Sequence, residues 1–220
     1  LTVKWQFRSI DSSDVDGNDR IENFVFADGS RWTATDVERL TLSAQQTAGN
    51  DLVFGYQSED VIDAGAGNDT LQGNGGSDTY AFGRGDGQDV LDETSDTYGS
   101  SADAIRFKDG VTVNDVILMR SGEDLIIKIA GTNDQMTISN QHTTQDSSGV
   151  NGTGRIENFV FADGTVWTAL DVDNRLLVGA QSPGNDDVRG YETADTLDGG
   201  TGNDTLHGLR GDDTYIFGRG

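Results

Sequence analysis

Apolar residues recur every nine positions in two stretches of the chain, and each of them stands two residues after an aspartate. In the first stretch the aspartates are Asp51, Asp60, Asp69 and Asp78, and the apolar residues are Val53, Ile62, Leu71 and Tyr80. In the second stretch the aspartates are Asp186, Asp195, Asp204 and Asp213, and the apolar residues are Val188, Leu197, Leu206 and Tyr215. This spacing predicts one structural unit for every nine residues.

The residues between the apolar positions predict tight turns. In Ala64–Gln72, six residues rich in Gly, Asn and Asp precede three residues that have Leu71 at their centre. Glycine tolerates positive φ, and Asn and Asp tolerate the left-handed region, so the six can reverse the chain. The other three form a short strand whose apolar side chain points inward. Because one repeat cannot bury that side chain alone, we expect a flattened coil of parallel strands with two repeats in each turn.

Such a coil stacks its aspartates in columns, with successive members eighteen residues apart. A column of carboxylates repels itself unless a counter-ion lies between them. A hard divalent cation with oxygen ligands removes the repulsion, and calcium suits an irregular cage of carboxylates and backbone carbonyls better than magnesium does. The first coil continues, after a two-residue insertion, to Asp89, which follows Asp78 by eleven residues.

Alternating patterns outside the two stretches predict further strands and a helix. Strands are expected at Leu1–Phe7, Arg20–Phe26, Arg31–Thr33, Ala104–Phe107, Asp115–Arg120, Asp124–Ala130 and Gln135–Ser139. Asp28 and Gly29 form a hairpin turn signal, and residues 11–19 and 94–101 are expected to be polar connections. Thr33 or Thr35 is expected to cap a short helix that ends near Leu42.

A second, longer period of 135 residues relates the two ends of the chain. Residues 1–85 recur as residues 136–220 with 47 identities. The predicted fold class is therefore all-β, with parallel β-roll blocks alternating with small antiparallel β capping domains in a tandem repeat of about 135 residues. The expected boundaries are a partial capping domain at 1–46, a first roll at 47–93, a capping or linker domain at 94–182 and a truncated second roll at 183–220.

The composition excludes several classes of partner. Asp and Glu number 38 against 15 Lys and Arg, which gives a formal net charge of -23. Nucleic acid and anionic membrane surfaces are therefore not expected as partners, since phosphate binding depends on Lys and Arg. The chain has no Cys, and no apolar run approaches the roughly 20 residues that span a bilayer, so we expect no membrane insertion. It begins with Leu1 and shows no signal peptide, so we expect it to be an excerpt of a longer protein.

The nine-residue units resemble the calcium-binding nonapeptide repeats of RTX (repeats-in-toxin) proteins, whose pattern is G-G-x-G-x-D-x-U-x. Gly199–Asp204 has all three glycines of this pattern and its aspartate. Other units depart from the pattern: Ala64 replaces the first glycine, and Ser58 replaces the glycine at position four. The segments between the rolls resemble, more loosely, the haemolysin-type calcium-binding related domain that accompanies such repeats.

The resemblance implies that position-six carboxylates and loop carbonyls hold calcium between adjacent turns. It implies that Asp51 pairs with Asp69, Asp60 with Asp78, Asp186 with Asp204, and Asp195 with Asp213. The expected metal-binding residues are Asp51, Asp60, Asp69, Asp78, Asp89, Gly65, Gly67, Gly73, Gly75, Asp186, Asp195, Asp204, Asp213, Gly200 and Gly202.

No residues with the spacing of a catalytic site were found. The histidines, His142 and His207, align with Phe7 and Gln72 one module earlier, and neither of these can replace an imidazole in catalysis. No Ser-His-Asp or zinc-type spacing is present. Glu22 and Asp28 could pair for acid–base chemistry, but a strand-face Glu and a turn Asp explain them better. We therefore expect no enzymatic activity.

These observations predict a calcium-binding structural module of a large secreted bacterial protein. The resemblance to RTX proteins implies that a type I system exports the chain unfolded and that the chain folds on binding calcium outside the cell. The expected partners are calcium ions and neighbouring modules of the same chain. Two alternatives remain open. One is an adhesive or surface-layer array whose β-domain binds glycan or neighbouring chains, including copies of itself. The other is the C-terminal stability and export region of a secreted hydrolase.

Overall fold

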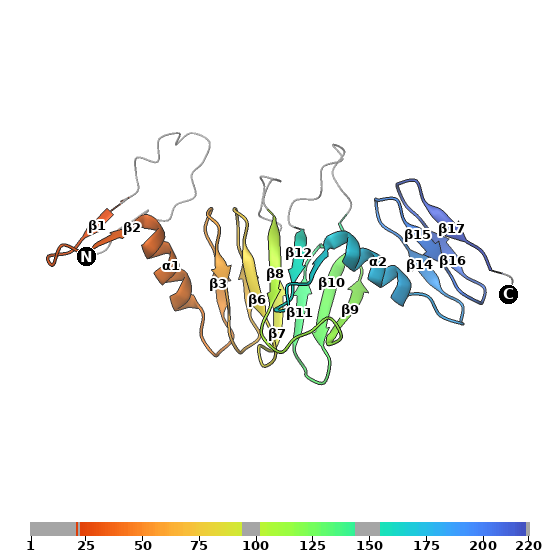
Figure 1. Cartoon of the computed structure of the whole chain (residues 1–220), viewed down its shortest axis with the longest axis horizontal. Helices are drawn as coiled ribbons and strands as arrows, with labels where there is room; N and C mark the ends of the chain where they lie inside the picture. Colours follow the sequence, from red (N-terminus) through yellow and green to blue (C-terminus); the bar gives the residue numbers. More distant parts are fainter. Residues whose placement is uncertain (1–20, 22, 94–101, 144–154, 219–220) are drawn as a thin grey trace.

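The computed structural model describes residues 21, 23–93, 102–143 and 155–218, and within these ranges it contains 17 strands and two helices. Figure 1 shows the elements arranged along one long axis. The hairpin of β1 (Asn23–Val25) and β2 (Arg31–Thr33) lies at one end, and β17 (Thr214–Ile216) lies at the other. The all-β class predicted from the sequence is confirmed.

The first nonapeptide stretch forms a flattened coil whose successive strands fall alternately in two sheets. β3 (Leu52–Phe54) pairs in parallel with β5 (Thr70–Gln72), and β4 (Val61–Ile62) pairs in parallel with β6 (Thr79–Phe82). In both pairs the partner residues are 18 positions apart. This register is the one that a period of nine with two repeats in each turn predicts.

The two-residue insertion after β6 changes the register without breaking the coil. β7 (Gln88–Leu91) pairs in parallel with β5, and Thr70 lies opposite Val90, 20 positions later. The extra residues are absorbed in the turn before β7, where Gly85 and Gly87 have φ values of 90° and 98°. Only glycine adopts such a backbone without strain.

The strands between the two rolls continue the sheets of the first roll. β8 (Asp103–Phe107) pairs in parallel with β6, β11 (Gln135–Ile138) with β7, and β12 (Ile156–Val160) with β8. The antiparallel pairs that the sequence predicted are also present. β9 (Val116–Ser121) and β10 (Asp124–Ile129) form an antiparallel ladder with β11, and β13 (Val166–Thr168) pairs with β12.

Two continuous sheets result, with the strand orders β3-β5-β7-β11-β10-β9 and β13-β12-β8-β6-β4. The four strands expected between residues 104 and 139 are all present, and each of their ends lies within one residue of its expected position. Their pairing is mixed, however, so they do not form a separate antiparallel layer. The physical reason is that parallel addition to β6 and β7 covers strand edges that would otherwise be open.

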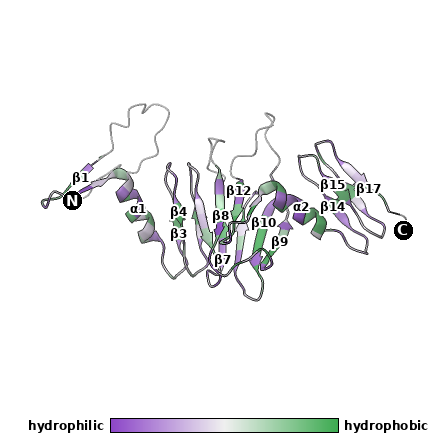
Figure 2. Cartoon of the chain, viewed as in Figure 1, coloured by the Kyte–Doolittle hydropathy of each residue, from purple (hydrophilic) through white to green (hydrophobic). Residues whose placement is uncertain are grey.

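One hydrophobic core runs between these sheets, from Val53 in β3 to Trp167 in β13. The inward residues of the first roll, Val53, Ile62, Leu71 and Tyr80, are all at most 1% exposed. β10, mainly green in Figure 2, buries Leu125, Ile127 and Ile129, as its alternating pattern predicted. The core therefore joins the roll and the following strands into one packed unit, called the first unit below, which spans β3 to β13.

Two helices connect the hairpins to the rolls. α1 (Ala34–Gln45) begins after Thr33, whose hydroxyl accepts a hydrogen bond from the Asp36 backbone, while the Asp36 carboxylate accepts one from the Thr33 backbone. This reciprocal cap favours helix formation. The sequence predicted Thr33 or Thr35 as the cap and placed the end of the helix three residues early. α2 (Ala169–Gly179) has the same cap, formed by Thr168 and Asp171.

The second roll repeats the first at its start. β14 (Asp187–Arg189) pairs in parallel with β16 (Thr205–His207), and β15 (Thr196–Asp198) pairs with β17. These four strands and α2 begin 135 residues after β3 to β6 and α1. The recurrence of the elements agrees with the long period in the sequence, and the domain boundaries stay a prediction.

Not every predicted inward residue of the second roll is buried. Val188 and Leu197 are at most 1% exposed, whereas Tyr215 is 42% exposed. The equivalent Tyr80 is fully buried because β8 pairs with its strand. Among the described residues, no strand pairs with β17 in the way that β8 pairs with β6. The predicted strand at 1–7, the loop at 11–19, Arg20 and the connection at 94–101 lie outside the described residues.

The core predicts a strong difference between two isoleucines on neighbouring strands. Ile127 of β10 is fully buried, and Ile117 of β9 is 47% exposed. Ile127→Ala should lower the free energy of unfolding by about 2–5 kcal/mol, the usual cost of such a cavity. Ile117→Ala should change it by less than about 0.5 kcal/mol. Urea unfolding of both variants measures this, and similar losses in the two would contradict the assigned faces of the sheet.

Candidate metal centre

A ladder of hydrogen bonds from backbone N–H groups to aspartate carboxylates runs along one side of the first roll. The backbone N–H of Asp51 donates to Oδ1 of Asp69 at 2.8 Å, and that of Asp69 donates to Oδ1 of Asp89 at 3.0 Å. Asp51 and Asp69 immediately precede β3 and β5, and Asp89 lies in β7, so the three occupy similar positions in successive turns of the coil. The carboxylates therefore fix the register of successive turns, and they lie in the column that the sequence predicted.

A second ladder follows the opposite side of the roll. The Asp60 N–H donates to Oδ1 of Asp78, and the Asp78 N–H donates to Oδ1 of Asp103, both at 2.8 Å. The Asp103 N–H then donates to Oε2 of Glu157 at 2.8 Å. Asp103 and Glu157 thus extend the column into the strands beyond the roll.

Sequence reasoning missed Asp103 and Glu157. Asp103 stands at the start of a strand, as the other column members do, and this position was the available signal. Glu157 is the counterpart of Glu22, which was interpreted as an ordinary strand-face residue. Glu22 lies outside the described residues. Glu157, at the equivalent position of the second copy, supplies the last carboxylate of the second ladder.

Glu93 is a third carboxylate that the nonapeptide period did not predict. Its Oε1 accepts hydrogen bonds from the Gly73 N–H, at 2.8 Å, and from the Tyr80 hydroxyl. The Glu93 side chain is fully buried. Through these hydrogen bonds, Glu93 connects the turn between β5 and β6 to the segment that follows β7.

The second roll has the same two ladders in shorter form. The Asp186 N–H donates to Oδ1 of Asp204 at 3.0 Å, and the Asp195 N–H donates to Oδ1 of Asp213 at 3.1 Å. All four aspartate pairs that the resemblance implied are therefore brought together by direct hydrogen bonds. Each bond uses only Oδ1 of the acceptor carboxylate.

Glycines allow the stacked turns to approach closely. A Cβ at Gly65 would lie 2.6 Å from the carbonyl oxygen of Thr47, and a Cβ at Gly67 would lie 2.7 Å from Oδ1 of Asp69 and against the carbonyl of Gly49. Both glycines have positive φ. The space beside them is therefore lined by carbonyl and carboxylate oxygens from two turns of the coil.

The other predicted glycines differ in what they contact. Gly200 and Gly202 repeat the arrangement, and a Cβ at Gly200 would lie 2.6 Å from the carbonyl oxygen of Ser182. A Cβ at Gly73 would overlap Oδ2 of Asp78, so Gly73 also borders a carboxylate. Gly75 instead faces the side-chain amide of Gln57, with 2.7 Å between the built Cβ and Oε1. Among the predicted glycines, Gly75 therefore has the least geometric support as a metal-binding residue.

Two carboxylate oxygens of the predicted metal ligands are buried without a hydrogen-bond partner among the described residues. They are Oδ2 of Asp69 and Oδ2 of Asp78, on side chains of residues that are 1% exposed. A buried ionised oxygen without a partner costs several kcal/mol unless a cation compensates it. Together with the carbonyls beside the glycines, these oxygens form an all-oxygen donor set, which is the set that calcium prefers. The residues therefore fit a calcium ion.

The first turn of each roll is arranged differently. Both oxygens of Asp51 accept hydrogen bonds from Thr47, from its N–H at 2.6 Å and from its hydroxyl at 2.9 Å. Ser182 makes the same two contacts with Asp186, at 2.8 and 2.7 Å. These carboxylates are already satisfied within their own turns. Asp51 and Asp186 are therefore weaker candidates for metal ligands than Asp69 and Asp78.

The electrostatics of the columns explain why a cation is needed. Burial, together with the charges of Asp103 and Asp60, raises the pKa of Asp78 to about 8. Burial likewise raises the pKa of Asp89 to about 7, with a contribution from Asp69. Burial also raises the pKa of Asp69. Without a cation, the folded columns thus favour protonated carboxyl groups near neutral pH.

The ligand set is dominated by the backbone rather than by side chains. Within the described ranges, no three His, Cys, Asp or Glu side chains converge on one point. A cation between two turns would therefore be held by one or two carboxylates together with backbone carbonyls. Within the same ranges, no helix is long and apolar enough to cross a membrane.

The fold and the donor set define a class: a parallel β-roll whose oxygen donors fit a hard cation. The comparisons with known families agree. Residues 47–71, 54–91 and 182–220 match the RTX calcium-binding nonapeptide repeat, and residues 1–36 and 124–171 match the haemolysin-type calcium binding protein related domain. The chain therefore carries RTX calcium-binding nonapeptide repeats and segments of this related domain, and Ca²⁺ is the ion that the repeats bind.

The chain is similar in sequence to the iron-regulated protein FrpA of Neisseria meningitidis serogroup C. FrpA is 36% identical to this chain over 124 residues, which cover 56% of this chain and 10% of the relative. The chain thus spans about a tenth of the length of this relative.

The raised pKa values predict that acid partly replaces the cation. The carboxyls of Asp78, Asp89 and Glu157 have pKa values of about 8, 7 and 7 in the fold, against about 4 when unfolded. The folded chain therefore holds protons on these carboxyls at pH values where the unfolded chain has released them. The stability that this protonation contributes is complete below pH 4 and is lost as the pH rises through 8. In a calcium chelator, lowering the pH from 8 to 6.5 should increase the β-structure seen by far-ultraviolet circular dichroism. An unchanged or falling signal would contradict this.

Proposed function

We propose that this chain is a structural module that folds when it binds calcium and that belongs to a large secreted bacterial protein. The observation that carries the proposal is the buried pair of unpartnered oxygens, Oδ2 of Asp69 and Oδ2 of Asp78. The chain stacks these acids at the cost of charge repulsion, and calcium offsets that cost.

The proposed ligands come from consecutive turns on the same side of the roll. Between the first two turns they are the Asp69 carboxylate and the carbonyls of Thr47 and Gly49, which lie beside Gly65 and Gly67. On the other side, Asp78 takes the place of Asp69. When bound, the ion supplies two positive charges to the column. Asp89, Asp204 and Asp213 hold the corresponding positions in a later turn and in the second roll.

Binding energy is folding energy for such a module, because the ligands are not assembled in the unfolded chain. Extracellular calcium modules have dissociation constants of about 10⁻⁴ to 10⁻³ M. A chain with this affinity stays unfolded where free calcium is scarce and folds where calcium reaches millimolar levels. This behaviour suits export as an unfolded chain, by the type I route that RTX repeats imply, followed by folding outside the cell.

Adhesion is the second candidate, and one observation favours it. Phe26 and Trp32 of the first hairpin are 41% and 43% exposed and contact each other with ring centroids 4.8 Å apart. Exposed aromatic rings are suited to glycan or protein contacts. The equivalent Phe161 and Trp167 are buried, and Phe161 stacks on Phe107 at 4.5 Å. Packing between modules therefore explains these aromatics more simply, and a glycan pull-down at millimolar calcium separates the two.

A calcium titration followed by far-ultraviolet circular dichroism tests the proposal. We expect a cooperative gain of β-structure near millimolar calcium, because each ion neutralises carboxylates from two turns. Magnesium at the same concentrations should be much less effective, since it prefers a regular octahedral site with bound water. A chain that is fully folded in chelator, or that responds equally to both ions, would contradict the proposal.

The substitution Asp69→Asn tests the assigned carboxylate. The amide oxygen of Asn can still accept the hydrogen bond from the Asp51 N–H, so the turn keeps its register while the charge is lost. We expect the calcium midpoint to rise by about tenfold, the change that about 1.4 kcal/mol produces. Asp187→Asn is the matched control, because the side chain of Asp187 is 78% exposed on the same kind of strand. Equal midpoints for the two variants would exclude Asp69 as a ligand.

A further inference from the structure

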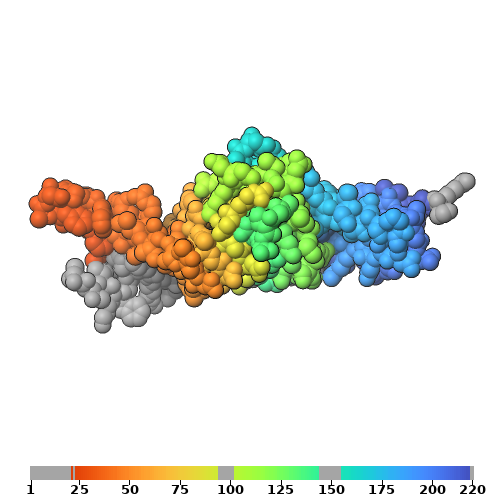
Figure 3. All heavy atoms as spheres, turned by 90° about the horizontal axis from the view of Figure 1, so that it is seen from below, coloured from red at the N-terminus to blue at the C-terminus, as the bar shows by residue number. Residues whose placement is uncertain are grey.

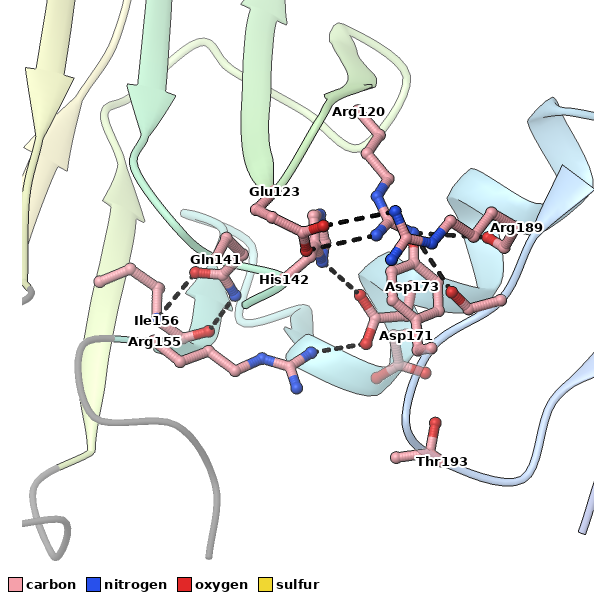
Figure 4. A network of polar contacts seen from close by, with 12 residues as sticks. Arg120, Glu123, Gln141, His142, Arg155, Ile156, Asp171, Asp173, Arg189 and Thr193 are labelled. Atoms are coloured by element: carbon pink, nitrogen blue, oxygen red, sulfur yellow. Dashed lines mark hydrogen bonds and ion pairs between the residues drawn. The ribbon is translucent and has the colours of Figure 1, made fainter. Parts of the chain in front are cut away.

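A buried polar cluster lies where the second roll meets the first unit (Figure 4). We call it the junction cluster, and its members are Arg120, Glu123, His142, Arg155, Asp173 and Tyr191. Arg120 and Glu123 flank the turn between β9 and β10, His142 follows β11, and Arg155 precedes β12. Asp173 lies in α2, and Tyr191 follows β14. The calcium-binding repeats do not account for this cluster.

His142 is the centre of the cluster, and its side chain is fully buried. Its Nδ1 lies 3.3 Å from Oδ1 of Asp173, but the two are not aligned for a hydrogen bond. Among the described residues, its Nε2 has no hydrogen-bond partner either. The other oxygen of Asp173 pairs with the Arg155 guanidinium at 2.5 Å. The imidazole is therefore enclosed beside a carboxylate that another cation already engages.

The other face of the imidazole contacts the second roll. The rings of His142 and Tyr191 have centroids 5.0 Å apart, and the Arg120 guanidinium lies 4.7 Å above the Tyr191 ring. The same guanidinium donates to the carbonyls of Arg189 and Gly190, at 3.4 and 3.3 Å. These contacts attach the first strand and turn of the second roll to the first unit. Tyr191 belongs to the small core of that roll.

We propose that the junction cluster is an acid-sensitive latch: neutral His142 holds the second roll against the first unit, and protonation of His142 releases it. The charges around the imidazole support this direction. Three guanidinium groups, those of Arg120, Arg155 and Arg189, face two carboxylates, those of Asp173 and Glu123. Each of these carboxylates already pairs with at least one guanidinium, so protonation of His142 would add a buried positive charge without adding a negative one.

The competing effects on His142 can be ranked. Burial lowers its pKa, and the charges of Arg120 and Arg155 lower it further, while Asp173 raises it. The net direction of the pKa shift is downward, because burial is the largest of these effects. A lowered pKa means that this group stabilises the folded junction above about pH 6.5, and that the contribution is lost progressively as the pH falls below 6.5.

The sequence of this chain provides matched controls. The position equivalent to His142 in the first copy is Phe7, and the position equivalent to His207 is Gln72. His207 is 55% exposed on β16, where its Nε2 lies 3.6 Å from Oδ1 of Asp187. His142→Phe and His207→Gln therefore introduce residues that the chain uses at the same sites of its other copy. One variant removes the buried imidazole, and the other removes the exposed one.

The test compares the stability of the full chain at pH 7.5 and pH 5.5 in saturating calcium, by urea unfolding. We expect acid to shift the unfolding equilibrium of the wild type by about tenfold relative to His142→Phe, the limit for a group of pKa 6.5 examined one unit lower. His207→Gln should behave as the wild type does. Carboxylate titration is common to all three chains and cancels. Equal pH dependence of the wild type and His142→Phe, or loss of the effect in His207→Gln, would overturn the latch.

Two further measurements keep the test decisive if His142→Phe does not fold. Proton NMR of the wild type follows the His142 imidazole, and we expect its titration midpoint to lie below 6.5; a midpoint at or above 6.5 would overturn the proposal. Hydrogen exchange at pH 5.5, corrected for intrinsic rates, should show lost protection in α2 and β14 while β3 to β7 stay protected. Uniform protection would overturn it as well. Both can be repeated in chelator, so failure of the latch is distinguishable from failure of calcium binding.

Discussion

The hydrogen bond from an aspartate N–H to the carboxylate one coil turn away is the interaction on which this structure depends. It ties Asp51 to Asp69 and Asp60 to Asp78, and the second roll repeats it. Each bond sets the register of two turns and also brings a charge next to its neighbours in a buried column. The same contact thus builds the fold and creates the repulsion that calcium removes.

The roll is stabilised further because its sheets do not end with the nonapeptides. β8, β11 and β12 pair in parallel with strands that the period of nine built, and a single core runs through to β13. The ladder follows the same path, from Asp78 through Asp103 to Glu157. The related domain therefore acts as a continuation of the roll. Calcium bound in the turns and apolar packing in the sheets stabilise one and the same unit.

Periodicity made the roll predictable from the sequence, and loss of periodicity explains what was missed. The 18-residue register, the four aspartate pairs, the helix cap at Thr33 and the alternation in β10 all follow from local spacing. Parallel pairing of β8 with β12 joins residues about 50 positions apart and has no local signal. For the same reason Glu157 was interpreted as a strand-face residue. The burial of His142 was not predictable either, because it depends on contacts from four segments that are separate in the sequence.

Segment-resolved hydrogen exchange in millimolar calcium and in chelator tests the central claim most directly. The reporters are the backbone amides of Asp51, Asp60, Asp69 and Asp78, since these are the donors of the ladder. We predict strong protection of these amides in calcium and its loss in chelator at neutral pH. Equal protection in both conditions would mean that the columns stack without an ion, and the account of calcium as the folding switch would be wrong.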